Sequence, residues 1–466
     1  MKADQLIQLT IAEAARLFEA GELSPVELTR ACLERVEALE AKLNAFVTLL
    51  PELAVAEAKA AEERLGRGKR LGPLDGMPFA IKDLYETKGI RTTAGSKILA
   101  DYVPAEDATC IRRLREQGVV LLGKLNMHEW AFGGTSVVSH FGPTHNPWAL
   151  DRVTGGSSGG AGAALAASLC LGSLGSDTGG SIRMPASMCG IVGLKPTFGR
   201  VSRHGVVPLS DTLDHAGPMT RTVEDAALVL QAIAGFDPDD PTTEDVPVPD
   251  YLAALSGEVR GLRVGVPEKD VLSGGDEDVE TSFRAALKTL EGLGASLVDV
   301  EIPRLQEAAA IWLAVAGPEA AAFHRRNMEE RPGDFSEQVR LRLQLGLQLR
   351  AVDYLGGLES QQQLRAEVEA QYAKIDVLVT PTTAFSATKI EDELAARGRE
   401  VHFHRFTCPF NLTGQPAISL PCGFDGQGLP VGLQIVGRRF DEETVLRVAH
   451  AYEQATEWHL RRPPLD

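Results

Sequence analysis

The chain has 466 residues, 44% of them hydrophobic, and a formal net charge of −17 at pH 7. A chain of this length and composition can bury a large core, as α/β enzymes do. The excess of acidic residues argues against a basic surface of the kind that binds nucleic acid, so we expect no nucleic-acid partner.

Six cysteines are scattered along the chain without a C-x-x-C pair. This spacing is not that of a disulfide framework or of a zinc site, and we expect reduced, buried thiols, no metal and no cofactor. The first residues show no signal-peptide pattern, and the longest apolar run is interrupted by serine and glycine. We therefore expect a cytoplasmic protein that does not contact a membrane.

The first part of the chain has the pattern of helices. Thr10 with Glu13, and Ser24 with Glu27, fit the capping box, in which a hydroxyl and an acidic side chain satisfy the first backbone N–H groups. Apolar residues follow each box at helical spacing. Residues 1–65 are therefore predicted to form a helical N-terminal segment.

From residue 74 onward, short apolar runs alternate with turns and helical patterns. This alternation predicts an α/β fold whose mixed, largely parallel central sheet is covered on both faces by helices. We expect one domain over 1–466, in which 237–375 is a variable, mostly helical region on the substrate side. The predicted strands are 77–81, 119–122, 169–175, 191–194, 262–266, 297–300, 377–380, 417–420 and 431–436.

The stretch 155–181, GGSSGGAGAALAASLCLGSLGSDTGGS, joins two serine-bearing glycine turns through an alanine-rich helix pattern. Close packing of small residues is one interpretation, and a phosphate cradle at the helix start is a second, although no P-loop lysine is present. A nucleophile elbow at Ser158 is a third. That elbow needs a strand directly before it, and residues 147–152 are not expected to form one.

A serine nucleophile also needs a base to accept its proton. The ten histidines show no recognisable order of a catalytic triad, although a triad formed only in space stays open. A buried neutral lysine can serve instead. Lys82 follows the apolar run 79–81 and lies at a predicted strand end; the alternative is a surface lysine, or one paired with Asp83.

Four segments together carry a resemblance to the amidase signature family. They are GMPFAIKD at 76–83, GGSSGG at 155–160, GSDTGGSIR at 175–183 and GIVGLKPT at 190–197. The similarity runs from about 10 to 235 and again from 376 to 436.

The resemblance implies a triad of Ser181, Ser157 and Lys82, with a cis peptide bond before Ser157. It also implies an oxyanion hole built from the backbone N–H groups of four residues. The other assignments are orienting roles for Ser158, Asp177 and Arg183, and substrate contacts at Phe132, Gly133 and Gly134. The oxyanion-hole residues are Thr178, Gly179, Gly180 and Ser181.

The implied function is a serine hydrolase that cleaves the C–N bond of a carboxylic amide, or by the same chemistry an ester or carbamate, through an acyl-Ser181 intermediate. The expected partner is a small-molecule amide, and a homo-oligomer is left open. One alternative is the glutaminase subunit of a tRNA-dependent amidotransferase, which FGPT at 141–144 and RVSRHG at 200–205 resemble, whereas FTCPFNLTG at 406–414 resembles free-standing amidases. A nucleotide-binding module that uses GGSSGG is the alternative from another class.

Overall fold

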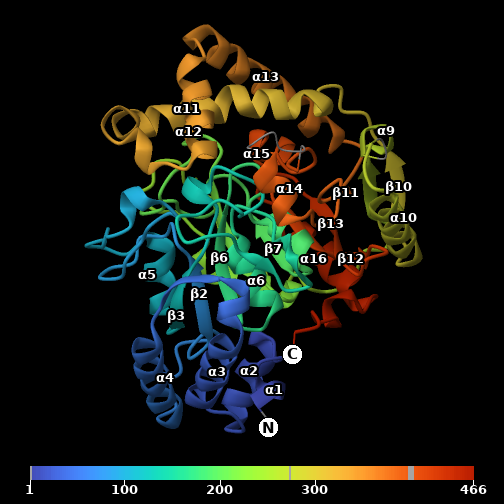
Figure 1. Cartoon of the computed structure of the whole chain (residues 1–466). Helices are drawn as coiled ribbons and strands as arrows, with labels where there is room; N and C mark the ends of the chain where they lie inside the picture. The colour runs from blue at the N-terminus through green and yellow to red at the C-terminus, as the bar shows by residue number, and fades with distance from the viewer. Residues whose placement is uncertain (1–2, 272–273, 397–402, 466) are drawn as a thin grey trace.

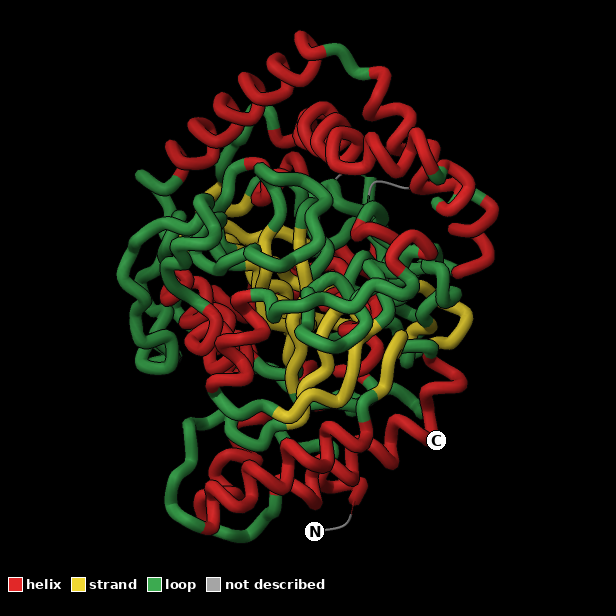
Figure 2. The backbone as a smooth tube through the Cα atoms, turned by 90° about the vertical axis from the view of Figure 1, so that its left-hand side faces the viewer, coloured by secondary structure: helices red, strands yellow, loops and turns green. Residues whose placement is uncertain are grey.

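The computed structural model describes residues 3–271, 274–396 and 403–465. Its centre is a sheet of eleven strands, which run through the middle of the molecule between helices (Figure 2). The strands in order across the sheet are β1 (Phe46–Leu49), β3 (Val120–Leu125), β2 (Pro78–Lys82), β6 (Gly172–Asp177), β8 (His215–Thr220), β7 (Val192–Lys195), β12 (Ala417–Phe424), β13 (Pro430–Val436), β11 (Val377–Pro381), β9 (Arg263–Val266) and β10 (Ser296–Asp299). The predicted α/β class with a mixed sheet is confirmed.

Parallel and antiparallel pairs occupy different parts of this sheet. β3, β2 and β6 are parallel neighbours near one edge, and β11, β9 and β10 are parallel neighbours at the other. The strands between β6 and β11 pair antiparallel. β9 and β10 come from the region 237–375, so this region contributes strands to the sheet as well as helices. Its definition as a separate substrate-side region stays a prediction.

Helices cover the sheet and close both ends of the molecule. α1 to α4 lie at one end, close to both chain termini, and α11 to α13 lie at the opposite end (Figure 1). The helices are α1 (Ala3–Leu6), α2 (Ile11–Ala20), α3 (Pro25–Leu43), α4 (Pro51–Gly66), α5 (Thr109–Glu116), α6 (Gly159–Ala166), α7 (Arg183–Cys189), α8 (Val223–Ile233), α9 (Glu268–Val271), α10 (Glu277–Gly292), α11 (Ala308–Glu330), α12 (Glu337–Gln348), α13 (Ala351–Gln371), α14 (Ile390–Ala395), α15 (Pro409–Leu412) and α16 (Glu442–Gln454).

The N-terminal segment is helical, as predicted, with one exception. Both capping boxes form, with Thr10 at the start of α2 and Ser24 at the start of α3. The exception is β1, which pairs antiparallel with β3 at the edge of the sheet. Its sequence FVTL contains aromatic and β-branched residues that favour a strand. The prediction of helices throughout 1–65 is wrong at this strand.

The prediction that residues 147–152 form no strand is also wrong. β4 (His145–Asn146) and β5 (Ala149–Val153) form a small hairpin outside the main sheet. Its turn is closed by the Asn146 side chain, whose Oδ1 accepts a hydrogen bond from the Trp148 backbone N–H at 2.9 Å. β5 belongs to this hairpin and does not lead from the main sheet into Ser158, so Ser158 still lacks the setting of a nucleophile elbow.

The strands β2 and β6, which lead into the sequence motifs, are buried along their whole length, as are β7, β8 and β13. All six cysteines are buried and free. Within the described residues, no helix is both long enough and apolar enough to cross a bilayer.

Candidate active site

The carboxyl ends of β2 and β6 lie side by side, because these strands are parallel neighbours. Lys82 is the last residue of β2, and Ser176 and Asp177 end β6. The Nζ atom of Lys82 lies 2.7 Å from Ser157 Oγ and 2.8 Å from Ser176 Oγ. The structure therefore brings two residues of the predicted triad, Lys82 and Ser157, into direct contact. Ser176, which is not part of the predicted triad, contacts Lys82 as well.

Burial decides the charge of Lys82, whose side chain is fully buried. Loss of hydration lowers the pKa of Lys82 to about 7, although the carboxylates of Asp177 and Asp214 act in the opposite direction. Asp83 does not pair with Lys82, because it lies 3.5 Å from Lys124 Nζ in the neighbouring strand. The hydroxyls that contact Lys82 are neutral, so its amine can lose a proton near neutral pH.

Ser157 lies in the buried glycine turn 155–160, and the peptide bond between Gly156 and Ser157 is cis. The Ser157 carbonyl accepts a hydrogen bond from the His128 backbone N–H at 3.0 Å. A Cβ added at Gly156 would lie 2.7 Å from the Thr135 backbone nitrogen. Protein atoms therefore fill the space around this turn, and a phosphate cradle or nucleotide site in it is not supported.

The carboxylate of Asp177 holds the turn that carries Ser181. Asp177 Oδ1 accepts a hydrogen bond from the Gly180 backbone N–H at 2.7 Å. This N–H is committed within the turn, which corrects the assignment of Gly180 to the oxyanion hole. For Thr178, Gly179 and Ser181 the assignment stays a proposal.

Asp177 and Arg183 form a fully buried ion pair, with Arg183 Nη2 2.8 Å from Asp177 Oδ1. Burial alone would raise the pKa of Asp177, but the Arg183 guanidinium holds this pKa well below its usual range. Asn411 Nδ2 donates to the same oxygen at 2.8 Å, and Arg183 Nη1 donates to Gln434 Oε1 at 2.7 Å. The pair therefore ties the Ser181 turn to α15 and β13.

Ser158 lies between the two serine-bearing turns. Its Oγ donates to the Ser176 carbonyl and its backbone N–H donates to the Ser181 carbonyl, both at 3.3 Å. These contacts agree with an orienting position for Ser158, which faces the interior of the protein and is fully buried.

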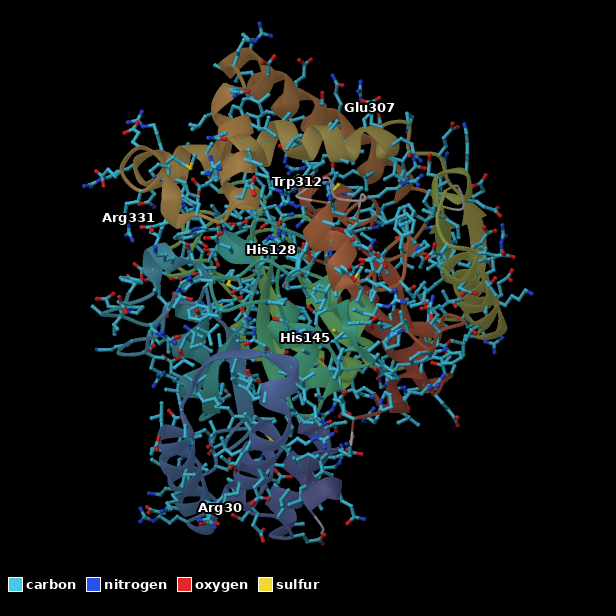
Figure 3. The ribbon with its side chains drawn as sticks, viewed as in Figure 1. Arg30, His128, His145, Glu307, Trp312 and Arg331 are labelled. Carbon is cyan, nitrogen blue, oxygen red and sulfur yellow. The ribbon has the colours of Figure 1, made fainter. Side chains whose placement is uncertain are left out.

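Ser181 lines a pocket of about 430 Å³ between the sheet and the helices α11 and α12. Phe132, Gly133 and Gly134 line this pocket, where the sequence places substrate contacts. Trp312 lies on the side of α11 that faces the sheet (Figure 3), and its Nε1 donates to the Thr178 carbonyl at 2.8 Å. The pocket wall is thus fastened directly to the Ser181 turn.

Apolar side chains make up most of the pocket wall, including Met184, Leu209, Leu313 and Leu345. Arg342 of α12 is the charged side chain in this lining, and its guanidinium lies 5.6 Å from the centre of the Phe132 ring. In the described part of the chain, no three His, Cys, Asp or Glu side chains gather as ligands for a metal ion.

Replacing Gly133 by alanine is expected to lower the free energy of unfolding by about 1–3 kcal/mol. The added Cβ would lie 2.2 Å from the ring of His128, which is fully buried, so the ring and its neighbours would have to shift in a close-packed interior. Denaturant unfolding of the variant measures this loss.

Gly134→Ala is the matched control, because its Cβ would approach no atom closer than Met184 Cε at 3.5 Å. We expect this control to change the free energy of unfolding by less than about 0.5 kcal/mol. Equal losses in both variants would show that the His128 contact does not limit residue size at 133.

Sequence reasoning assigned no role to several groups at this site. Ser176 contacts Lys82, the Thr178 hydroxyl donates to Asp214 Oδ1 at 2.5 Å, and Arg342 lies in the pocket wall. Ser176 stands inside a quoted motif, next to Asp177, and could have been considered there. Asp214 and Arg342 are distant in the chain and carry no local signal.

The chain was compared with known proteins. A model of the family described as Amidase matches residues 27–446. A glutamyl-tRNA(Gln) amidotransferase subunit from Geobacter metallireducens is 43% identical over 98% of this chain and 99% of its own length. The crystal structure of the corresponding subunit from Thermotoga maritima matches with a TM-score of 0.82 and 37% identity, over 96% of this chain and 95% of that one. A peptide amidase in complex with the competitive inhibitor chymostatin matches with a TM-score of 0.85 and 33% identity, over 98% and 99% of the two chains.

The names of these relatives contradict the partners predicted from the sequence. A small-molecule amide and no nucleic acid were expected, yet a relative that matches nearly the whole chain is a subunit of an enzyme named for a tRNA. The prediction is wrong because net charge was used to judge the chain by itself. The charge of one subunit does not decide what a larger assembly binds.

Proposed function

Because the chain belongs to the Amidase family, we propose that it hydrolyses a carboxylic amide through an acyl intermediate on Ser181. In this proposal Ser157 and Lys82 relay the proton. The single observation that carries it is the 2.7 Å contact between Lys82 Nζ and Ser157 Oγ in a fully buried setting. Burial lowers the pKa of Lys82 to about 7, so a large share of this lysine is neutral at pH 7.

The proposed reaction begins with neutral Lys82. Its amine takes the proton of Ser157 while Ser157 takes that of Ser181, and Ser181 Oγ attacks the amide carbon. The relay then returns the proton to the amide nitrogen, the C–N bond breaks, and ammonia or an amine leaves. Water, deprotonated by the same relay, hydrolyses the ester on Ser181 and restores the enzyme.

The negative charge that forms on the carbonyl oxygen needs fixed hydrogen-bond donors. Backbone N–H groups of Thr178, Gly179 and Ser181 are the proposed donors, since the N–H of Gly180 is used by Asp177. Asp177 and Arg183 act as orienting residues in this proposal, because their buried network holds the turn.

The relatives favour the narrower role of glutaminase subunit of a tRNA-dependent amidotransferase over that of a free-standing amidase. In this role the amide is glutamine, and a partner subunit uses the ammonia. Arg342 supports it, because a guanidinium in a mostly apolar pocket wall can pair with the α-carboxylate of glutamine. The expected cytoplasmic location is part of the same proposal, since free, buried cysteines suit a reducing compartment.

Ammonia release from three primary amides tests this function. The panel contains glutamine, benzamide and a C-terminal peptide amide, and we expect saturable release from glutamine that rises when the other subunits of a relative's amidotransferase are added. Arg342→Gln should raise KM for glutamine by about 10-fold or more and leave KM for benzamide unchanged.

Turnover of benzamide or the peptide amide without turnover of glutamine would reject the subunit role and keep amide hydrolysis. If none of the three amides is turned over and Ser181 is not acylated, amide hydrolysis itself is rejected.

A further inference from the structure

A second cavity lies apart from the pocket of Ser181 and shares no lining residue with it. It has a volume of about 370 Å³ and lies where α13 approaches the segments just before β12 and just after β13. We call it the arginine cavity. We propose that it is a binding site for a small phosphate or phosphate monoester, independent of the hydrolytic site. Its lining residues are Glu369, Tyr372, Ala373, Gln415, Arg438 and Arg439.

Gln415 supplies the first argument. It is fully buried and lines the cavity, yet within the described residues neither Nε2 nor Oε1 of its side chain has a hydrogen-bond partner. Its main-chain carbonyl accepts a hydrogen bond from Lys195 Nζ, which fixes the backbone at this point. An amide that is buried without partners costs free energy, so a group that both accepts and donates hydrogen bonds is expected beside it.

Arginine side chains supply the second argument. Arg439 pairs with Glu244 through Nη2 at 2.6 Å, but its Nε is buried and has no partner among the described residues. The Nε of Arg365, which lies one helical turn before Glu369 in α13, is in the same condition. Arg439 Nε is therefore an unpaired donor in the lining of this cavity, and Arg365 Nε is a second unpaired donor in α13, the helix that borders it.

Both guanidinium groups approach Gly414. Its φ is +78°, and a Cβ built on it would lie 3.7 Å from Arg439 Nε and 3.9 Å from Arg365 Nη2. Burial lowers the pKa of Arg365 and the positive charge of Arg439 lowers it further, whereas Glu369 and Glu244 act in the opposite direction. The two cations repel each other, and the carboxylates of Glu244 and Glu369 offset part of this repulsion. A bound anion would offset more of it.

Phosphate fits this arrangement better than a carboxylate does. The planar guanidinium donates paired hydrogen bonds to either anion. Gln415 Oε1, however, needs a donor, and a carboxylate offers only acceptors. Hydrogen phosphate offers a P–OH donor together with acceptor oxygens. Glu369 is the carboxylate in the lining, and because it is exposed to solvent its repulsion of an anion is screened.

Phosphate binding to the full-length chain is measured by isothermal titration calorimetry at constant ionic strength, with sodium chloride as the balancing salt. We expect saturable binding of inorganic phosphate, with acetate at least about 10-fold weaker. Glycerol 3-phosphate is the second probe: tighter binding than inorganic phosphate identifies a phosphate monoester as the ligand, and weaker binding identifies phosphate itself.

The variants are Arg365→Gln and Gln415→Leu, and the control is Arg326→Gln on the exposed face of α11, where the arginine side chain is 84% exposed. Both cavity variants should raise Kd by about 10-fold or more, and the control should leave it unchanged. Gln415→Leu removes both unpaired atoms, so it should fold at least as stably as the parent. Absence of saturable binding, equal binding of acetate, or an unchanged Kd in both cavity variants would overturn the proposal.

Discussion

The Ser181→Ala variant is expected to lose at least about 10³-fold in kcat, because without the hydroxyl no acyl intermediate can form. The substitution removes one oxygen from a residue that is 5% exposed at the pocket surface. Substrate should therefore still bind, and KM should change little. Steady-state ammonia release from the amide with the highest kcat/KM measures both constants.

Ser173→Ala is the matched control for this variant. Ser173 is a fully buried serine of β6, the strand that leads into the Ser181 turn, and its Oγ donates a long hydrogen bond to the neighbouring Leu174 carbonyl at 3.5 Å. We expect the control to keep the parent rate. A Ser181→Ala enzyme that hydrolyses the amide at the parent rate would contradict the assignment of the nucleophile.

The order of the strands shows what could be predicted from the sequence and what could not. β2 and β13 are apolar runs bounded by turns, so each could be recognised locally. β8 has the sequence HAGPMT, in which Gly217 and Pro218 give no strand pattern. It is a strand because β6 and β7 pair with it on its two sides. Such long-range pairing cannot be recognised from the residues of β8 themselves.

The candidate site likewise contains residues that could be predicted from the sequence and residues that could not. Lys82 could be selected because an apolar run ends at it, and the resemblance supplied Ser157 and Ser181. The contact between Trp312 and the Thr178 carbonyl joins residues 134 positions apart, and nothing near Trp312 indicates that its indole faces this turn. The individual contacts of the pocket wall therefore depend on how α11 and α12 pack, which the sequence pattern alone does not determine.

The sequence could not predict which buried lysine pairs with Asp83 either. Lys82 and Lys124 end or nearly end parallel neighbouring strands, and the sequence offered only Lys82 as a partner of Asp83. In the structure Asp83 lies 3.5 Å from Lys124 Nζ, whereas the hydrogen-bond partners of Lys82 are the hydroxyls of Ser157 and Ser176. Burial lowers the pKa of Lys124 to about 8 and that of Lys82, which has hydroxyl partners, further to about 7. Of these two lysines, Lys82 is the better suited to act as a neutral base.

Replacing Lys82 by methionine is expected to lower kcat/KM by about 10³-fold and to remove its pH dependence near neutrality. Burial lowers the pKa of Lys82 to about 7 from an ordinary value of 10.5. The lysine is therefore protonated and inactive below pH 7, and neutral and active above it. In the parent enzyme kcat/KM should rise about tenfold per pH unit up to pH 7 and then level off.

Lys88→Met is the control, because Lys88 follows the same strand by a few residues and is exposed to solvent. It should keep both the parent rate and the rise of kcat/KM through pH 7. Methionine preserves most of the volume of the lysine stem at 82, so the variant should fold, and denaturant unfolding checks this. If the rise of kcat/KM with pH up to pH 7 persists in Lys82→Met, another group acts as the base. The 2.7 Å contact with Ser157 then serves packing alone, and the proton relay must begin elsewhere in the site.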